Sequence, residues 1–442
     1  MKIAGIIAEY NPLHRGHAFH IQKTRQLTGA DYVIVVMSGS FVQRGAPALL
    51  SKQLRAEMAL RCGADAVAEL PVEYSCASAE GFAYGAIALL TQLGADYVSF
   101  GSEDGRIFPF TVISSIVEEE PCMYKSLLRQ NLRLGYSFPK ARSMALTEYL
   151  SAALHSENGA LQEKPFSSDR ELRAFLSSPN NILGLEYCKA ICRLKSPLIP
   201  VTVKREGGGY HDKNLCDGFS SASAIREHLK SGRRTSELKS QLPKEAFELF
   251  AEAVRERECV YTDDLSLLLK YALLRENRQS ILKYQDMNPE LANRIYRQLG
   301  EFESFSQFAL LLKTKELTYS RIQRSLLHVL LGMEWRKNSD FGKEWEGNAE
   351  DAFVHRKNRF SRPEYIRILG MRRSSGEVLS YAKNHSPLPV IIKPARAEKI
   401  LSGEAARMFQ RDIFASQLWE SVAADKAGRK GVHEYQKKFI IV

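Results

Sequence analysis

The first twenty residues restrict the possible folds of this chain more than any other segment. Residues 2–8 form a short apolar run that predicts a buried strand, and Asn11-Pro12 ends it. His14-Arg15-Gly16-His17 follows, and residues 18–23 are typical of a helix. Because the first N–H groups of a helix have no internal partner, a strand that turns sharply into a helix predicts an anion site.

Two histidines mark this turn. His14 and His17 are three residues apart and share one face of the first helical turn, and Gly16 lets a bulky ligand approach the backbone. Two imidazoles there can donate hydrogen bonds to phosphate oxygens and stabilise the charge that develops as a phosphorus–oxygen bond breaks. Metal binding is a weaker alternative, because no carboxylate lies in the turn and His20 is displaced around the helix.

Strand and helix patterns alternate in the segment that follows. Each expected strand ends in a loop that carries glycine or serine, and the elements are strand 32–37, helix 52–62, strand 66–70, helix 78–93 and strand 97–100. This order predicts an α/β fold with a doubly wound, Rossmann-like parallel sheet, whose ligands bind beyond the carboxyl ends of the strands. We expect the histidine turn, the loop at residues 38–45 and Gly101 along that edge.

A second phosphate site is predicted later in the same domain. A strand at residues 200–204 leads to Arg205, and Ser221, Ser223 and Arg226 then open a helix. A serine-rich helix start with an arginine one turn on suits phosphate. Residues 105–175 are expected to form a helical insertion with a polar break at 156–164, and Asn180 and Asn181 begin a helix where asparagine is normally a cap. Arg44 follows a presumed strand end and is a further candidate. Glu9 is beside the turn, where it could contact either substrate or a metal-bound water.

The positive charge of the chain is concentrated near its end. The net charge is +11, and residues 351–442 hold 18 Lys and Arg against 9 Asp and Glu, so they carry +9. A polar, basic stretch at residues 230–244 is typical of a linker, which divides the chain into a nucleotide-binding domain (1–240) and a mainly helical, basic region (241–442). This region predicts a nucleic-acid partner, although a merely solvated basic surface remains an alternative. The candidate phosphate contacts are Arg356, Lys357, Arg359, Arg362 and Arg367. Phe360 and Tyr365 lie among them and are suited to base stacking.

The cysteines and the hydropathy exclude other classes. The seven cysteines form no C-x-x-C pair, so a zinc ribbon is not expected, and their odd number suggests reduced thiols in the cytoplasm. The apolar runs are too short for a membrane span, and the N-terminus lacks the pattern of a signal peptide. No dedicated metal site is predicted.

Several of these stretches resemble a known family. His14-Arg15-Gly16-His17 resembles the HxGH signature of the nucleotidyltransferase superfamily, and residues 221–226 resemble its ISSTxIR signature. The closer resemblance, over nearly the whole chain, is to the bacterial tRNA(Met) cytidine acetate ligase family. It rests on residues 8–17, 38–45, 69–71, 100–103, 179–184, 210–212, 221–226, 317–324 and 365–370. This chain departs from the family pattern at Leu13, Arg15 and Ser40, where Phe, Asn and Asn are usual.

The resemblance implies a two-step reaction. Acetate attacks the α-phosphate of ATP, giving acetyl-adenylate and pyrophosphate, and the N4 amine of the wobble cytidine of elongator tRNA(Met) then takes the acetyl group and releases AMP. His14, His17 and Arg226 would be catalytic, Ser221 and Ser223 would help Arg226 to hold pyrophosphate, and Mg²⁺ would arrive with ATP. The nucleotide would also contact Gly101, Arg205 and either Asn180 or Asn181. The turn that binds ATP would comprise Ile7, Ala8, Glu9, Tyr10, Asn11, Pro12, Leu13, His14, Arg15, Gly16, His17, Ala18, Phe19 and His20.

Two other functions stay open at this point. A small-molecule adenylyl- or cytidylyltransferase explains both signatures but leaves the basic C-terminal region without a role. A non-catalytic RNA-binding protein on a nucleotide-binding fold is opposed by the intact His14, Gly16 and His17.

Overall fold

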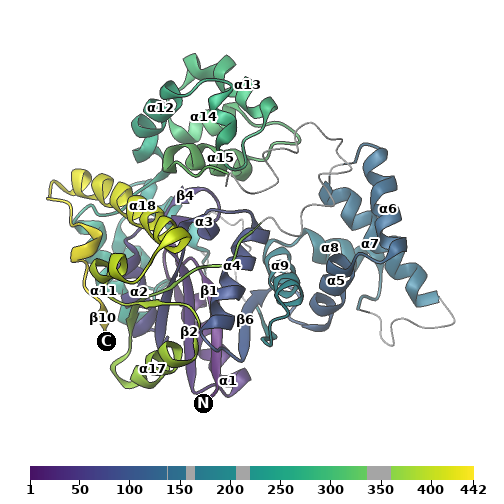
Figure 1. Ribbon diagram of the computed structural model, residues 1–442, viewed down its shortest axis with the longest axis horizontal. Helices are drawn as coiled ribbons and strands as arrows, with labels where there is room; N and C mark the ends of the chain where they lie inside the picture. The colour runs from purple at the N-terminus through teal and green to yellow at the C-terminus, as the bar shows by residue number, and fades with distance from the viewer. Residues whose placement is uncertain (137, 156–164, 206–219, 336–359) are drawn as a thin grey trace.

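One mostly parallel sheet organises the molecule (Figure 1). The computed structural model describes residues 1–136, 138–155, 165–205, 220–335 and 360–442. The sheet runs in the order β10-β8-β5-β2-β1-β6-β7, with β9 beside β8. All of its pairings are parallel except that of β5 with β8. The strands are β1 (Ile3–Ala8), β2 (Tyr32–Ser38), β5 (Ala66–Leu70), β6 (Tyr97–Ser102), β7 (Ile199–Lys204), β8 (Ile366–Met371), β9 (Val390–Ile391) and β10 (Ile440–Ile441).

Successive side chains along a strand point to opposite faces of the sheet, and both faces are buried. On β2, Ile34 and Val36 join one core cluster, while Val33 and Val35 join another. The first face is covered by α4 (Ala79–Gln92), which packs against α9 (Pro179–Leu194). The second is covered by α1 (Arg15–Thr28), α2 (Lys52–Arg61) and α11 (Lys244–Arg255). The predicted doubly wound α/β fold is therefore confirmed.

The order of the first strands fixes where a ligand can enter. Sequence-adjacent strands run β1, β2, β5 in one direction, and the chain then returns to place β6 and β7 on the other side of β1. The crevice at such a reversal lies beyond the carboxyl ends of the strands. Here it lies after Ala8 of β1 and around Gly101 of β6.

Two helical groups flank this sheet. Between β6 and α9 lie α5 (Phe108–Glu119), α6 (Cys122–Arg133), α7 (Phe138–His155) and α8 (Asp169–Ser177), which form the expected insertion. The other group comprises η2 (Thr262–Leu265), α12 (Ser266–Arg275), α13 (Pro289–Gln298), α14 (Phe305–Leu311) and α15 (Tyr319–Leu331). It has its own core, which also includes Phe41 of a short hairpin, β3 (Phe41–Val42) and β4 (Ala46–Pro47), and Val72 of α3 (Val72–Ser75).

The C-terminal residues complete the N-terminal sheet. Strands β8 and β10 extend it beyond β5, and α17 (Gly376–His385) and α18 (Gly403–Ala427) belong to the same part of the chain. Trp419 of α18 donates to the carbonyl of Ala48 at 2.7 Å. The expected boundary at residue 240 is therefore corrected, because strands from both sides of it share one sheet. The difference arises because β8 pairs with β5, a long-range contact that no local sequence pattern predicts.

Candidate active site

The histidine turn positions two imidazoles through their own backbone. His14 is the N-cap of α1, and its Nδ1 accepts a hydrogen bond from Gly16 N at 3.1 Å. His14 N in turn donates to Nδ1 of His17 at 3.3 Å. The two rings stack with centroids 3.7 Å apart. Because each Nδ1 accepts from a backbone N–H, the proton of each neutral ring is on Nε2, which leaves Nε2–H as a donor.

Burial and positive charge keep these rings neutral. Desolvation, with Arg205 and Arg226 nearby, lowers the pKa of His14 to about 3. Desolvation also holds the pKa of His17 well below its usual value, with the charges of His14, Arg205 and His20 adding to the effect. Without an anion, both rings are therefore neutral donors at physiological pH. The same positive field favours a bound polyphosphate.

His20 has a different environment. Its Nε2 is 3.0 Å from the hydroxyl of Ser99, which itself accepts from Thr24 Oγ1 at 2.7 Å. Desolvation and Arg205 lower its pKa to about 4. In the described ranges no group of three or more His, Cys, Asp or Glu side chains is arranged to hold a metal ion. The Ser99 contact fixes the ring as part of α1 packing.

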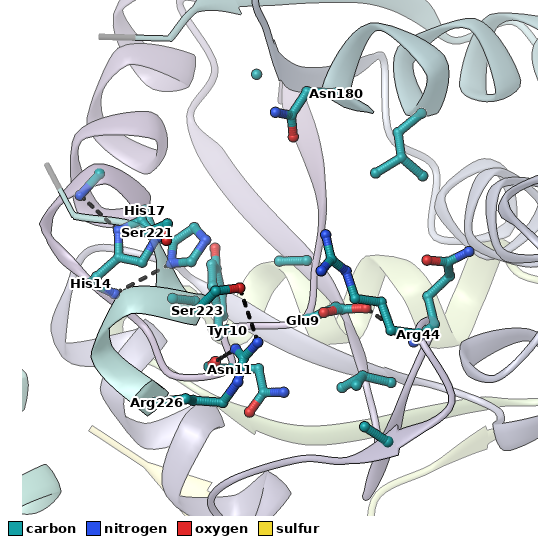
Figure 2. A pocket seen from close by; sticks show the side chains of 18 of the residues that line it. Glu9, Tyr10, Asn11, His14, His17, Arg44, Asn180, Ser221, Ser223 and Arg226 are labelled. Atoms are coloured by element: carbon teal, nitrogen blue, oxygen red, sulfur yellow. Dashed lines mark hydrogen bonds between the residues drawn. The ribbon is translucent and has the colours of Figure 1, made fainter. Parts of the chain in front are cut away.

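The second signature meets the first at Arg226. Ser221 is the N-cap of α10 (Ala222–Lys230), and its hydroxyl accepts from Ala224 N at 3.1 Å. Arg226 donates to Ser223 Oγ at 3.1 Å and also to the backbone carbonyl of Asn11. The guanidinium thus joins the α10 N-terminus to the histidine turn (Figure 2). Two helix N-termini face one site, which suits an extended anion.

A cavity of about 440 Å³ joins these parts at the carboxyl edge of the sheet. Its wall includes most of the residues predicted to bind ATP, namely Ile7, Ala8, Glu9, Tyr10, Asn11, His14, Gly16, His17, Phe19, His20, Gly101, Asn180, Arg205, Ser221, Ser223 and Arg226. The predicted residues outside this wall are Pro12, Leu13, Arg15 and Ala18. Leu13 is fully buried in the core, and Arg15 donates instead to the carbonyl of Ser240 at 3.1 Å.

The two asparagines at the start of α9 have different surroundings. Asn180 lines the cavity and donates to Glu103 Oε1 at 2.6 Å. Asn181 accepts from the backbone N–H groups of Glu103 and Asp104 at 3.0 and 3.3 Å, so it ties α9 to the loop after β6. Gly101 lies beside the cavity, where an added Cβ would come 3.4 Å from Arg205 Cγ. Of the two asparagines, Asn180 is the one placed to contact a ligand.

The opposite wall contains residues that sequence reasoning missed. Residues 260–263 and Ser306 of the helical group line the cavity, together with Lys230 and the hairpin residues 42–44. Residues 42–44 belong to the loop that was expected along this edge, and Arg44 was itself a candidate. Lys230 was not predicted, although it lies one turn after Arg226 on α10. Residues 260–263 and Ser306 carry no local signal, because only the packing of the helical group against the sheet brings them to the cavity.

The basic segment expected to bind tRNA divides into three parts. Arg356, Lys357 and Arg359 lie outside the described residues. Arg362 is exposed. Arg367, in contrast, is 3% exposed within β8, with Nη1 3.0 Å from Glu69 Oε2 and Nη2 paired with Glu434.

The prediction that Arg367 contacts tRNA is therefore wrong, because its guanidinium is used inside the protein. Tyr365, one of the aromatics suggested for base stacking, is also buried and donates to Asp412.

This fold and site define a class, and comparisons with known proteins identify it. The family model described as HIGH Nucleotidyl Transferase matches residues 1–434. The tRNA(Met) cytidine acetate ligase of Clostridium novyi (strain NT) is 38% identical over 426 residues, 96% of this chain and 97% of that protein. The apo crystal structure of Thermotoga maritima TmcAL matches with a TM-score of 0.87 at 30% identity, over 100% of both chains. The crystal structure of that protein bound with alpha-thio ATP matches with a TM-score of 0.85, also at 30% identity and over 100% of both chains. This chain belongs to the tRNA(Met) cytidine acetate ligase family.

Proposed function

We propose that this protein is an ATP-dependent ligase that acetylates N4 of the wobble cytidine of elongator tRNA(Met), using acetate. The observation that carries the proposal is the convergence of both nucleotidyltransferase signatures on one cavity, where Arg226 of the second signature donates to the Asn11 carbonyl in the histidine turn. Family membership supplies the identity of acetate and of the target base. Acetate activation would occur as acetyl-adenylate, with release of pyrophosphate, and AMP would leave in the second step.

The site suits attack by a carboxylate on a triphosphate. Two anions must approach one another, so donors and positive charge matter more than a base. The Nε2–H groups of His14 and His17 would donate to the α-phosphate as charge develops there. Because the neutral rings already carry these protons, no proton has to be transferred first. Arg205 adds a cation at the same wall.

The departing pyrophosphate would be held by the second signature. Ser221, Ser223 and Arg226 line the cavity at the N-terminus of α10, where unpaired backbone N–H groups favour an anion. Mg²⁺ would enter with ATP. Because no cluster of acidic or histidine ligands is found among the described residues, phosphate oxygens and water would be its main ligands.

The nucleoside end would lie toward β6 and α9. Gly101, Asn180 and Arg205 belong to that wall, and apolar side chains line it beside them, namely Phe100, Leu183 and Tyr187. An amide next to apolar surface suits a purine, which needs stacking area and a few placed hydrogen bonds.

The tRNA would approach through the basic C-terminal region. Arg362 is an exposed member of that region, and Arg356, Lys357 and Arg359 remain predicted contacts. No helix within the described ranges combines the length and apolar character that a membrane crossing requires. We propose a cytoplasmic location, where tRNA, ATP and acetate are all available.

A labelling experiment tests this function. The protein is incubated with radiolabelled acetate, ATP and bulk tRNA, and the tRNA is then digested to nucleosides. Labelled N4-acetylcytidine is expected, and only when ATP is present. Formation of an adenylylated or cytidylylated small molecule without labelled tRNA would contradict the proposal.

A further inference from the structure

We infer that Glu9 accepts the proton that the cytidine amine loses when it takes the acetyl group. This inference rests on the proposed function and assigns a catalytic residue to its second step. Glu9 directly follows β1, at the carboxyl edge of the sheet, and lines the cavity. It lies apart from His14 and His17, the histidines that would face phosphate.

The backbone and one carboxylate oxygen of Glu9 are fixed by neighbours. Its carbonyl accepts from Arg55 Nη1 at 2.6 Å, and its Oε1 accepts from Gln43 N at 3.0 Å. Arg55 is itself fully buried and also bonds the carbonyls of Leu50 and Ser38. The second oxygen of Glu9, Oε2, has no hydrogen-bond partner within the described part of the chain, and the side chain is half-buried. A held carboxylate with one available oxygen is the geometry that a general base requires.

Glu9 is directed away from the phosphate-facing histidines. The Tyr10 ring lies edge-on to His17, with centroids 4.9 Å apart. Figure 2 shows Glu9 on the far side of Tyr10 from the histidines, toward Arg44. A carboxylate beside the triphosphate would repel it, whereas a carboxylate on the hairpin side can meet a nucleophile that enters along the opposite wall. That wall is the one formed by residues 42–44, 260–263 and Ser306.

The second step needs such an acceptor. The cytidine N4 attacks the carbonyl carbon of acetyl-adenylate, the new C–N bond forms, and the bond from that carbon to the phosphate oxygen breaks. AMP leaves with the electron pair, and the nitrogen loses one proton. The amine is a weak nucleophile because its lone pair is delocalised into the base, so proton removal as the bond forms assists attack. The proton would pass to Glu9 Oε2 and then to water.

Two other carboxylates line the cavity, and neither is as well placed. Asp263 accepts from Ser306 N at 2.7 Å and lies 3.7 Å from Lys230 Nζ, so both of its oxygens have partners. Glu227 follows Arg226 on the helix that faces pyrophosphate. Among the described residues, the charged or titratable groups that interact with Glu9 are Arg55 and the buried thiol of Cys76. Figure 2 shows Arg44 of the hairpin on the same side of the cavity.

The test separates the two half-reactions. In Glu9→Gln, the amide oxygen can still accept from Gln43 N, so the contact with the hairpin is kept. We measure two rates in this variant, the acetate-dependent exchange of pyrophosphate into ATP and the single-turnover transfer from preformed adenylate to tRNA. We expect the transfer rate to fall about 100-fold more than the exchange rate. Glu9→Asp should recover part of the transfer rate.

Each alternative has its own outcome. Unchanged transfer in Glu9→Gln would overturn the inference and would point to a phosphate oxygen of the leaving AMP as acceptor. Equal loss of both steps would also overturn it, because Glu9 would then act in ATP binding or activation. In the matched control Glu227→Gln, a selective loss of transfer would likewise contradict it. Absence of acetylcytidine with the unmodified enzyme would instead defeat the proposed function, so the two failures are distinguishable.

Discussion

Arg226 and Arg367 occupy opposite kinds of site. Arg226 lines the cavity and donates to the Asn11 carbonyl and the Ser223 hydroxyl, and its charge helps to lower the pKa of His14. Arg367 is buried between the carboxylates of Glu69 and Glu434. The charge of Arg226 therefore acts on the cavity. The charge of Arg367 is neutralised by two carboxylates and stabilises the fold.

The largest expected effect is on stability, at Arg367. In Arg367→Met, the carboxylates of Glu69 and Glu434 stay buried, and Lys52 is the cation that remains paired with them within the described residues, at 2.7 and 3.2 Å. Removal of one partner from a buried ionic group costs about 3–5 kcal/mol. We expect the free energy of unfolding, measured in urea, to fall by about that amount.

Arg226→Met is the matched comparison, because it removes the same group from the wall of the cavity. It should lower activity far more than stability. If Arg367→Met lost tRNA affinity while its stability stayed unchanged, Arg367 would contact RNA, and the structural role assigned to it would be wrong.

The second effect is on catalysis, at the histidine turn. His17→Ala removes one Nε2–H donor from the cavity, and loss of a single donor to a developing oxyanion costs about 10²–10³-fold in rate. Acetate-dependent exchange of pyrophosphate into ATP should fall by that factor, while tRNA affinity should be retained. Loss of tRNA binding as well would show that the nucleotide site and the RNA surface are not separate.

The contrast also shows what the sequence could predict. The histidine turn was predictable because its requirement is local: a strand, a turn and a helix start bring His14 and Gly16 together whatever surrounds them. The fate of Arg367 depends on β8 pairing with β5, three hundred residues away in the chain, and no local pattern encodes this pairing. Charge density near Arg362 and Arg367 therefore predicted a function for the segment but could not distinguish an exposed arginine from a buried one.

The same limit applies to the cavity wall. Thr262 and Ser306 reach the site only because the helical group packs on Phe41 and Val72. The resemblance to a family extended further than local patterns, because Asn180 and Arg205, carried over by position, both line the cavity.

A third prediction concerns pH and the neutral state of His14. Its pKa is lowered to about 3 in the fold against about 6.5 when unfolded, so the unfolded chain binds more protons between these values. Its contribution to stability is complete above pH 6.5 and is lost as the pH falls. From pH 7.5 to 5.5 the unfolding free energy should drop by about 1.4 kcal/mol for this residue. The pH dependence in urea should be smaller by that amount in His14→Asn, and an equal dependence in both proteins would show that His14 is charged in the fold.

The smallest effect is expected at Arg362, five residues from Arg367 but exposed. One phosphate contact contributes about one unit to the slope of log affinity against log salt, so Arg362→Glu should reduce that slope by about 1 and leave ATP binding and stability unchanged. The control is Arg255→Glu, which makes the same charge change at an exposed arginine of α11. Titrations of labelled tRNA at several salt concentrations measure both variants. Equal slopes for the two would mean that Arg362 belongs to a solvated surface, and a reduced slope for Arg362→Glu alone would separate an RNA-facing arginine from the structural arginine in the same segment.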